Sequence, residues 1–268
     1  MNLFDTMKKL QDEGQSFAVV SIVDTEGSVP RKSGKLVLTE KGQSFGSVGG
    51  GYLEKEAKSL ASQCILKNAN TLAWIENPSS EAEKLHTIRS TGKIQVFIEV
   101  FKPKPRLVII GAGHVGSAIA KAASSLDFNI EIIDKRPELV NEACFPMAAT
   151  ISVAPQLEEA LSPLQVDSST YVVIAYEAND ERPIRCLLDK PWAYCGMLGS
   201  RKKILSLWSK LENEGYPRNL LDRIHAPIGI DIGAETPEEI AISVLAEILA
   251  VKNGKTPRFM KDTVHSGG

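Results

Sequence analysis

The chain has 268 residues, of which 43% are hydrophobic, and its formal net charge is −2. The hydrophobic share supports a packed core in one large domain or two modest ones, which excludes a chain that is disordered overall. The balanced charge lacks the basic excess that nucleic-acid binding requires, and no run of 18 apolar residues is present to span a membrane. Four cysteines stand far apart without CxxC spacing, so we expect reduced thiols and a cytoplasmic protein.

The first hundred residues are expected to form a small α+β domain. Segment 1–14 has the pattern of an amphipathic helix rather than of a secretory signal. Apolar runs and turn residues predict strands at 17–23, 35–39, 44–48 and 94–101. Apolar residues recur at helical spacing over 52–68, which predicts a helix there.

Two prolines in segment 102–106 oppose both helix and sheet, so we predict a hinge there between domains of 1–101 and 107–268. Strands and helices alternate after the hinge, which is typical of a Rossmann-like, doubly wound parallel sheet. Strands are predicted at 107–110, 130–133, 171–175 and 193–197, and helices at 113–126, 200–214 and 237–252. The expected fold class is therefore α/β, with a small N-terminal domain before the Rossmann-like one.

A glycine motif, GAGHVG at 111–116, stands directly after a predicted strand and opens a helix. In a dinucleotide site of this kind Gly111 permits the tight turn, and Gly113 lets a phosphate approach the backbone. Gly116 lets the helix pack closely on the strand. The alternative is an inherited fold whose nucleotide pocket is empty or repurposed. His114, within the motif, either faces a ligand or is a solvated residue at the helix start.

Charged residues follow the next predicted strand. Asp134 stands where a carboxylate holds a ribose hydroxyl in dinucleotide sites. Lys135 and Arg136 come directly after it, so a ligand with a 2′-phosphate is also compatible with the sequence.

A second junction between strand and helix contains Gly199, Ser200 and Arg201. Ser200 is expected to cap the helix and Arg201 to add positive charge beside its open N–H groups, so the junction is either an anion site or a capped surface helix. Cys195, close to this junction, is a candidate for ligand contact. Segment 227–233 combines two glycines and an aspartate with apolar residues, which indicates backbone held close to another group.

Three successive glycines, Gly49, Gly50 and Gly51, precede the helix of the first domain. Such a run costs conformational entropy, and it suits a loop where side chains would block a ligand or a close backbone. The helix start offers free N–H groups for a phosphate, and Arg31 could add a bidentate clamp. The alternative is a tight connection without a ligand.

Several chemical classes lack support. The four histidines form no HxH or HExxH pattern and no cluster with cysteine, so we expect no structural zinc. There is no nucleophile elbow, no P-loop and no pair of carboxylates suited to acid–base chemistry, which disfavours a protease or a glycosidase.

The motifs GSVPR at 27–31 and GSVGGGYLE at 46–54 resemble the N-terminal signature of the XdhC/CoxI family. The motifs GAGHVG at 111–116, GMLGSRK at 196–202 and PIGIDIGAETPEEIA at 227–241 resemble its C-terminal Rossmann part. The resemblance implies an accessory protein, not an enzyme, that binds molybdenum cofactor and assists its sulfuration and insertion into a molybdenum hydroxylase such as xanthine dehydrogenase. It also implies a cytoplasmic homodimer that works with a cysteine desulfurase and the apo-enzyme.

The sequence departs from the family in three places. Segment 89–93 lacks the Cys-Gly-Gly of many members, Tyr52 replaces a cysteine that some members carry, and segment 176–180 lacks a histidine-rich run. Cys64 does not replace the missing cysteine, because its place in the apolar stripe of the predicted helix makes it a core residue.

The sequence thus predicts that one cleft between the domains binds molybdenum cofactor. The alternatives are an NAD(P)-dependent oxidoreductase and a diverged, non-catalytic binding or regulatory module. The predicted cofactor-binding residues are Arg31, Gly49, Gly50, Gly51, Glu54, Gly111, Gly113, His114, Gly116, Asp134, Gly199, Ser200 and Arg201.

Overall fold

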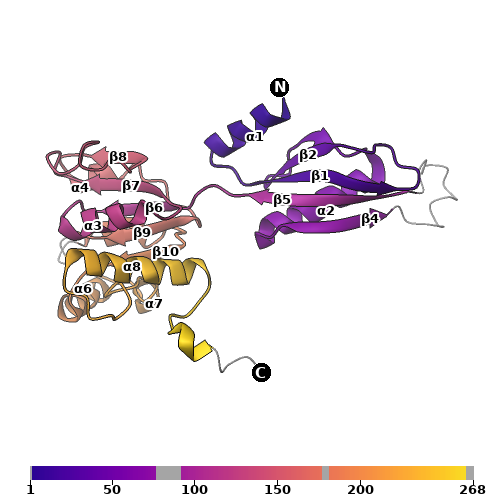
Figure 1. Cartoon of the computed structure of the whole chain (residues 1–268). Helices are drawn as coiled ribbons and strands as arrows, with labels where there is room; N and C mark the ends of the chain where they lie inside the picture. The colour runs from indigo at the N-terminus through magenta and orange to yellow at the C-terminus, as the bar shows by residue number, and fades with distance from the viewer. Residues whose placement is uncertain (1, 77–91, 177–180, 264–268) are drawn as a thin grey trace. The chain divides into compact units, whose positions relative to one another are not determined.

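A computed structural model describes residues 2–76, 92–176 and 181–263 of the chain (Figure 1). The chain divides between Pro103 and Lys104 into two compact units, here called the N-terminal unit and the Rossmann unit. Each unit has its own hydrophobic core. Within the described ranges, no helix is both long enough and apolar enough to cross a membrane.

The N-terminal unit is a five-stranded antiparallel sheet in the order β3-β2-β1-β5-β4. Helix α2 packs against one face of the sheet, and α1 covers part of the other face. Asn2 is the N-cap of α1 and forms a capping box with Asp5. The elements are α1 Leu3–Asp12, β1 Phe17–Glu26, β2 Lys35–Thr39, β3 Ser44–Ser47, α2 Gly51–Lys67, β4 Thr71–Glu76 and β5 Lys93–Phe101.

The Rossmann unit is a five-stranded parallel sheet in the order β10-β9-β6-β7-β8. This is the doubly wound order with a switch point between β6 and β9. Helices α3 and α8 lie side by side on one face (Figure 1), and α4 to α7 pack on the other. The elements are β6 Arg106–Ile110, α3 His114–Ala123, β7 Asn129–Asp134, β8 Thr150–Val153, α4 Leu157–Leu161, β9 Thr170–Ile174, α5 Arg182–Leu187, β10 Tyr194–Met197, α6 Arg201–Asn213, α7 Arg218–Leu221, α8 Pro237–Lys252 and a 3₁₀ turn at Met260–Thr263.

The predicted α/β fold class, with a small domain before a Rossmann-like one, is confirmed. The inner strands of the parallel sheet are recognisable because both of their faces are covered, so that they read as continuous apolar runs. Strands β4 and β8 were not predicted. Both lie at sheet edges, and only Ile75 of β4 and no residue of β8 is fully buried.

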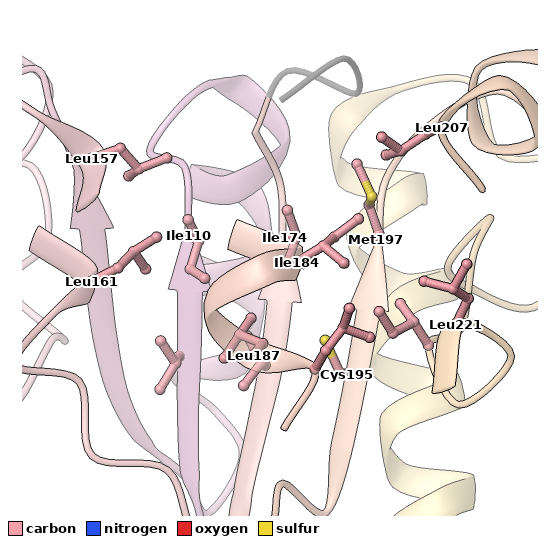
Figure 2. Close-up of a cluster of buried hydrophobic side chains, with 14 of the residues drawn as sticks. Ile110, Leu157, Leu161, Ile174, Ile184, Leu187, Cys195, Met197, Leu207 and Leu221 are labelled. Carbon is pink, nitrogen blue, oxygen red and sulfur yellow. The ribbon is translucent and has the colours of Figure 1, made fainter. Parts of the chain in front are cut away.

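Cys195 is a core residue, so the suggestion that it contacts a ligand was wrong. Figure 2 shows its sulfur in the cluster under α5 and α7, beside Leu187 and Leu221. The side chain is fully buried, and burial raises the pKa of the thiol to about 12. Cys64 lies on the buried face of α2, in the core of the N-terminal unit, as predicted.

Thiol labelling tests this placement. We expect iodoacetamide to label the exposed Cys144 in the native protein, and to label Cys64 and Cys195 only after unfolding, because a buried thiol is both inaccessible and protonated. Peptide mass spectrometry measures each site. Labelling of Cys195 in native protein at the rate of Cys144 would contradict the structure.

Candidate functional site

Three loops of the N-terminal unit meet at one place. A Cβ built on Gly49 would lie 3.4 Å from the Cβ of Pro30 and 3.7 Å from the backbone nitrogen of Arg31. Gly92 donates its N–H to the carbonyl oxygen of Ser28 at 2.9 Å. The structure therefore brings Arg31 beside the glycine run, as the sequence hypothesis requires; we call this group of loops the glycine-loop cluster.

The three glycines adopt conformations that other residues rarely reach. Gly49, Gly50 and Gly51 have φ values of 122°, 75° and 62°, all of which disfavour a side chain. A Cβ on Gly50 or Gly51 would meet nothing within 4 Å. The outer side of this loop is therefore open, with room for a ligand to approach the backbone.

Glu54, in the first turn of α2, holds this loop. Its Oε2 accepts hydrogen bonds from Ser47 Oγ at 2.6 Å, from Gly50 N at 3.1 Å and from Val48 N at 3.2 Å. Its Oε1 lies 3.0 Å from Lys58 Nζ. Because the carboxylate already accepts from two backbone N–H groups that a phosphate could use, its observed role is to position the loop. A direct contact with the cofactor stays a prediction.

The charge of Glu54 is stabilised by these contacts. Burial alone would raise the pKa of the carboxyl, but the hydrogen bonds from Ser47, Lys58 and Gly50 outweigh it and lower the pKa to about 2.

Arg31 is exposed, and its side chain makes no hydrogen bond or ion pair within the described residues. The cluster thus presents a free guanidinium beside an open, preformed loop.

The low pKa of Glu54 predicts a specific dependence of stability on pH. A carboxyl with a lowered folded pKa stabilises the fold above its unfolded pKa of about 4.3 and loses that contribution as pH falls toward the folded value. We expect wild type to be more stable than Glu54→Gln above about pH 5, and the difference to shrink as pH falls further. Thermal unfolding midpoints measure it.

The matched control is Glu56→Gln, two residues along the same helix, because no hydrogen bond joins Glu56 to the loop in the described part of the chain. A stability difference between wild type and Glu54→Gln that stays constant from pH 7 to pH 3 would refute the role of Glu54.

In the Rossmann unit, the first glycine motif has the expected geometry. Gly111 has φ 110°, and a Cβ on it would lie 2.4 Å from the carbonyl oxygen of Ala175, at the switch point. A Cβ on Gly116 would lie 1.9 Å from the carbonyl oxygen of Gly111, whereas one on Gly113 would meet nothing within 4 Å. The turn role of Gly111 and the packing role of Gly116 are confirmed, and Gly113 leaves the backbone open.

Alanine substitutions separate these roles. Gly116→Ala forces a methyl group against backbone, so we expect the free energy of unfolding to fall by about 1–3 kcal/mol. Gly113→Ala is the control, since its φ of −69° suits alanine and its Cβ has space; its effect should stay below about 1 kcal/mol. Urea denaturation measures both, and equal losses would contradict the geometry.

Asp134 is fully buried at the end of β7. Its Oδ2 accepts from Ala112 N and Arg136 Nη2, both at 2.7 Å, and its Oδ1 accepts from Arg136 Nε at 2.9 Å and Arg136 N at 3.0 Å. Burial would raise the pKa of the carboxyl, but the hydrogen bonds from Arg136 and Ala112 lower it. The carboxylate is thus engaged inside the protein rather than presented to a ribose.

The second junction lies at the same edge of the sheet as the glycine motif, because β6, β9 and β10 run parallel. Ser200 caps α6 by accepting from Lys203 N at 3.4 Å, as predicted. Ser200 and Arg201 are exposed, as is His114 at the start of α3. The two helix starts therefore share one edge, and both interpretations of His114 stay open.

Segment 227–233 is held against α8. Gly229 N donates to Glu247 Oε2 at 2.7 Å, and Ser243 Oγ donates to the carbonyl oxygen of Ile230 at 2.6 Å. A Cβ on Gly229 would lie 2.4 Å from Ser243 Oγ. The sequence predicted that the backbone of this segment lies close to another group. In the structure that group is helix α8 of the same unit.

The sequence interpretation missed one polar network. His225 Nδ1 lies 2.7 Å from Glu247 Oε1, and Tyr194 Oη donates to Glu247 Oε2 at 2.8 Å. The rings of Tyr194 and His225 are 4.6 Å apart. From the sequence, only the spacing of Ser243 and Glu247, one helical turn apart, could have indicated that both side chains lie on the same face of α8. No local pattern connects Tyr194 or His225 to that face.

Two departures from the family, segments 89–93 and 176–180, fall largely outside the described residues, since only Gly92, Lys93 and Tyr176 of them are described. Tyr52, the third, is exposed in the first turn of α2. Among the residues that the structure describes, no group of three or more His, Cys, Asp or Glu side chains could hold a metal ion.

Two family models match the sequence: one described as the XdhC Rossmann domain over residues 107–248, and one described as the XdhC and CoxI family over residues 10–74. The chain is 36% identical over its whole length to the uncharacterized protein YqeB of Escherichia coli K12, of which it covers 49%. It is 29% identical to a protein of Bacillus subtilis 168 named as a probable subunit of xanthine dehydrogenase, over 70% of the chain and 56% of that protein.

The chain is also 29% identical to the molybdenum cofactor insertion chaperone PaoD of Escherichia coli K12, over 57% of the chain and 42% of PaoD. It thus spans about half the length of the curated relatives it matches. A crystal structure described as a xanthine dehydrogenase from Bacillus halodurans has a TM-score of 0.52 and 22% identity, covering 96% of this chain and 97% of that one. At this identity the likeness concerns the fold.

Proposed function

This chain belongs to the XdhC and CoxI family, and we propose that it is an accessory protein of molybdenum hydroxylases. In this proposal it binds molybdenum cofactor as a cargo and assists its sulfuration and insertion into an apo-enzyme such as xanthine dehydrogenase. The relative named as a molybdenum cofactor insertion chaperone supports the proposal, as does the one named as a probable subunit of xanthine dehydrogenase.

The observation that carries the proposal is the glycine-loop cluster, where the exposed Arg31 lies beside an open loop with three positive φ values. Molybdenum cofactor is a pterin with a phosphate and an oxyanion metal, so its recognition requires N–H donors and cations. The N–H groups of Val48, Gly49 and Gly50 already donate to Glu54 and Ser47. In this proposal the anion is therefore bound chiefly by the guanidinium of Arg31, which binds phosphate or oxyanion bidentately, beside a loop whose glycines leave room for it. The residues of the cluster fit the cargo in this respect.

The residues of the cluster bind and orient, and they carry out no bond-breaking step in this proposal. Glu54 keeps the loop in one conformation before the cargo arrives, so that binding does not have to order it. Of the four thiols, Cys64 and Cys195 are buried in cores, whereas the exposed Cys144 and the partly buried Cys186 belong to the Rossmann unit and not to the glycine-loop cluster. We assign the delivery of sulfur to a partner cysteine desulfurase, as the family resemblance implies. The apo-hydroxylase and a second copy of this chain are the other proposed partners, in the cytoplasm.

A second candidate function is an NAD(P)-dependent oxidoreductase. The geometry of Gly111, Gly113 and Gly116 at the switch point favours a nucleotide in the Rossmann unit. An oxidoreductase function gives no role to the glycine-loop cluster of the N-terminal unit. We therefore prefer the accessory role, which uses this cluster.

Titration of the anaerobically purified protein with molybdenum cofactor tests the proposal. We expect tight binding that Arg31→Ala weakens about tenfold or more, because a charge-assisted hydrogen bond to an anion is lost. Lys32→Ala is the matched control, an exposed cation at the next position whose loss should change affinity less. NAD(H) and NADP(H) are titrated in parallel.

Binding of a nicotinamide dinucleotide without any binding of molybdenum cofactor would favour the second candidate. Equal affinities of wild type and Arg31→Ala for the cofactor would remove the glycine-loop cluster from the proposal.

A further inference from the structure

We propose that the Rossmann unit recognises a phosphate monoester at the carboxyl end of β7, that Arg136 is the residue that binds it, and that Asp134 acts by positioning Arg136. The sequence places Asp134 where a carboxylate holds a ribose hydroxyl, and it leaves a 2′-phosphate ligand open because Lys135 and Arg136 follow. If the phosphate belongs to a pterin cargo, the inference rests on the proposed function. If it belongs to a nucleotide, the inference is independent of that function.

The Asp134 carboxylate has no capacity left for a ligand. It is fully buried, and each of its oxygens already accepts two hydrogen bonds, three of them from Arg136 and one from Ala112 N. An ionised carboxylate has about four acceptor positions in all. A ribose hydroxyl at this place would have to displace a charge-assisted bond.

Arg136, in contrast, is presented outward. Its side chain is 41% exposed. The guanidinium uses Nε and Nη2 toward Asp134, whereas its Nη1 makes no hydrogen bond among the described residues. The N–H groups of Nη1 therefore remain as donors on a guanidinium whose orientation is fixed by two bonds to a buried anion. Such a planar donor group suits a phosphate.

A buried hydroxyl group lies at the same edge of the sheet as Arg136, since β7 and β9 both run parallel to β6. The Tyr176 hydroxyl, just beyond β9, is buried and has no hydrogen-bond partner within the described ranges. Glu138, two residues beyond Arg136, is exposed. Lys135 Nζ lies 5.7 Å from the centre of the Tyr176 ring. A buried O–H group without a partner is rare, and a bound acceptor such as a phosphate oxygen would satisfy it.

The position explains why a phosphate is the expected group. In doubly wound sheets the end of the second strand meets the ribose of a bound nucleotide, where a carboxylate accepts from the 2′-hydroxyl and an arginine accommodates a 2′-phosphate. Here the carboxylate faces inward and the arginine is exposed. The shared chemistry is a phosphate monoester, which occurs in two sources: the 2′-phosphate of NADP⁺ and the phosphate of the pterin cargo.

Two pairs of probes that differ by this phosphate test the inference. One pair is NADP⁺ and NAD⁺, and the other is the pterin cargo before and after treatment with a phosphatase. Calorimetric titration of the whole chain should show that the phosphorylated member of at least one pair binds about tenfold or more tightly. The pair that shows the difference identifies the source of the phosphate.

Arg136→Gln should abolish the difference within that pair. The matched control is Arg106→Gln: Arg106 also forms an ion pair with a β7 carboxylate, Glu131, at 2.5 Å, but it begins β6 and so lies at the opposite end of that strand from the glycine motif. Arg106→Gln should keep the preference. If Arg136→Gln does not fold because Asp134 is left unpaired, the double variant Asp134→Asn/Arg136→Gln removes both charges and should also lose the preference.

The inference is overturned if neither pair shows a preference in wild type, if none of the four probes binds, or if the preference survives in the Arg136 variants. Absence of binding by all four probes would reject both the inference and the proposed function, whereas absence of binding by the pterin cargo alone would reject only the proposed function. A preference for NADP⁺ without any pterin binding would support Arg136 while rejecting the cargo.

Discussion

One interaction recurs at the glycine loops of both units: a carboxylate of the chain accepts hydrogen bonds from the loop backbone. Glu54 binds Val48 and Gly50, Asp134 binds Ala112, and Glu247 binds Gly229. Glycine loops with positive φ are entropically costly to order. The internal carboxylates offset that cost in the folded state, and the shape of each candidate site depends on them.

The central elements could be predicted because burial leaves a strong pattern. Strands β6 and β9 are covered on both faces, and α2 and α3 bury regular stripes. Strands β4 and β8 lie at edges, so their apolar pattern is too weak to stand out in the sequence. The short helices α4, α5 and α7 were missed for a related reason, since each has only four to six residues and no full amphipathic period.

The candidate site was predictable where it depends on backbone shape, and not where it depends on the direction of a side chain. Gly111 and Gly116 have the predicted turn and packing roles, because their spacing encodes a strand, a turn and a helix. The sequence places Asp134 and Arg136 two positions apart but does not indicate that the carboxylate turns inward and binds the guanidinium. Tyr194, His225 and Glu247 are brought together only by tertiary packing.

The internal carboxylates also change what each loop offers to a ligand. Because Glu54 and Asp134 already accept from loop N–H groups, an incoming anion meets fewer free backbone donors than the glycine motifs alone imply. The remaining attraction comes from arginines at the rim, Arg31 in one unit and Arg136 in the other. A loop that is ordered before binding does not lose conformational entropy when the ligand arrives. Because only a few arginine contacts hold the ligand, its binding free energy stays limited, and so its release is easier. Both properties suit the proposed role of holding a cargo and passing it on.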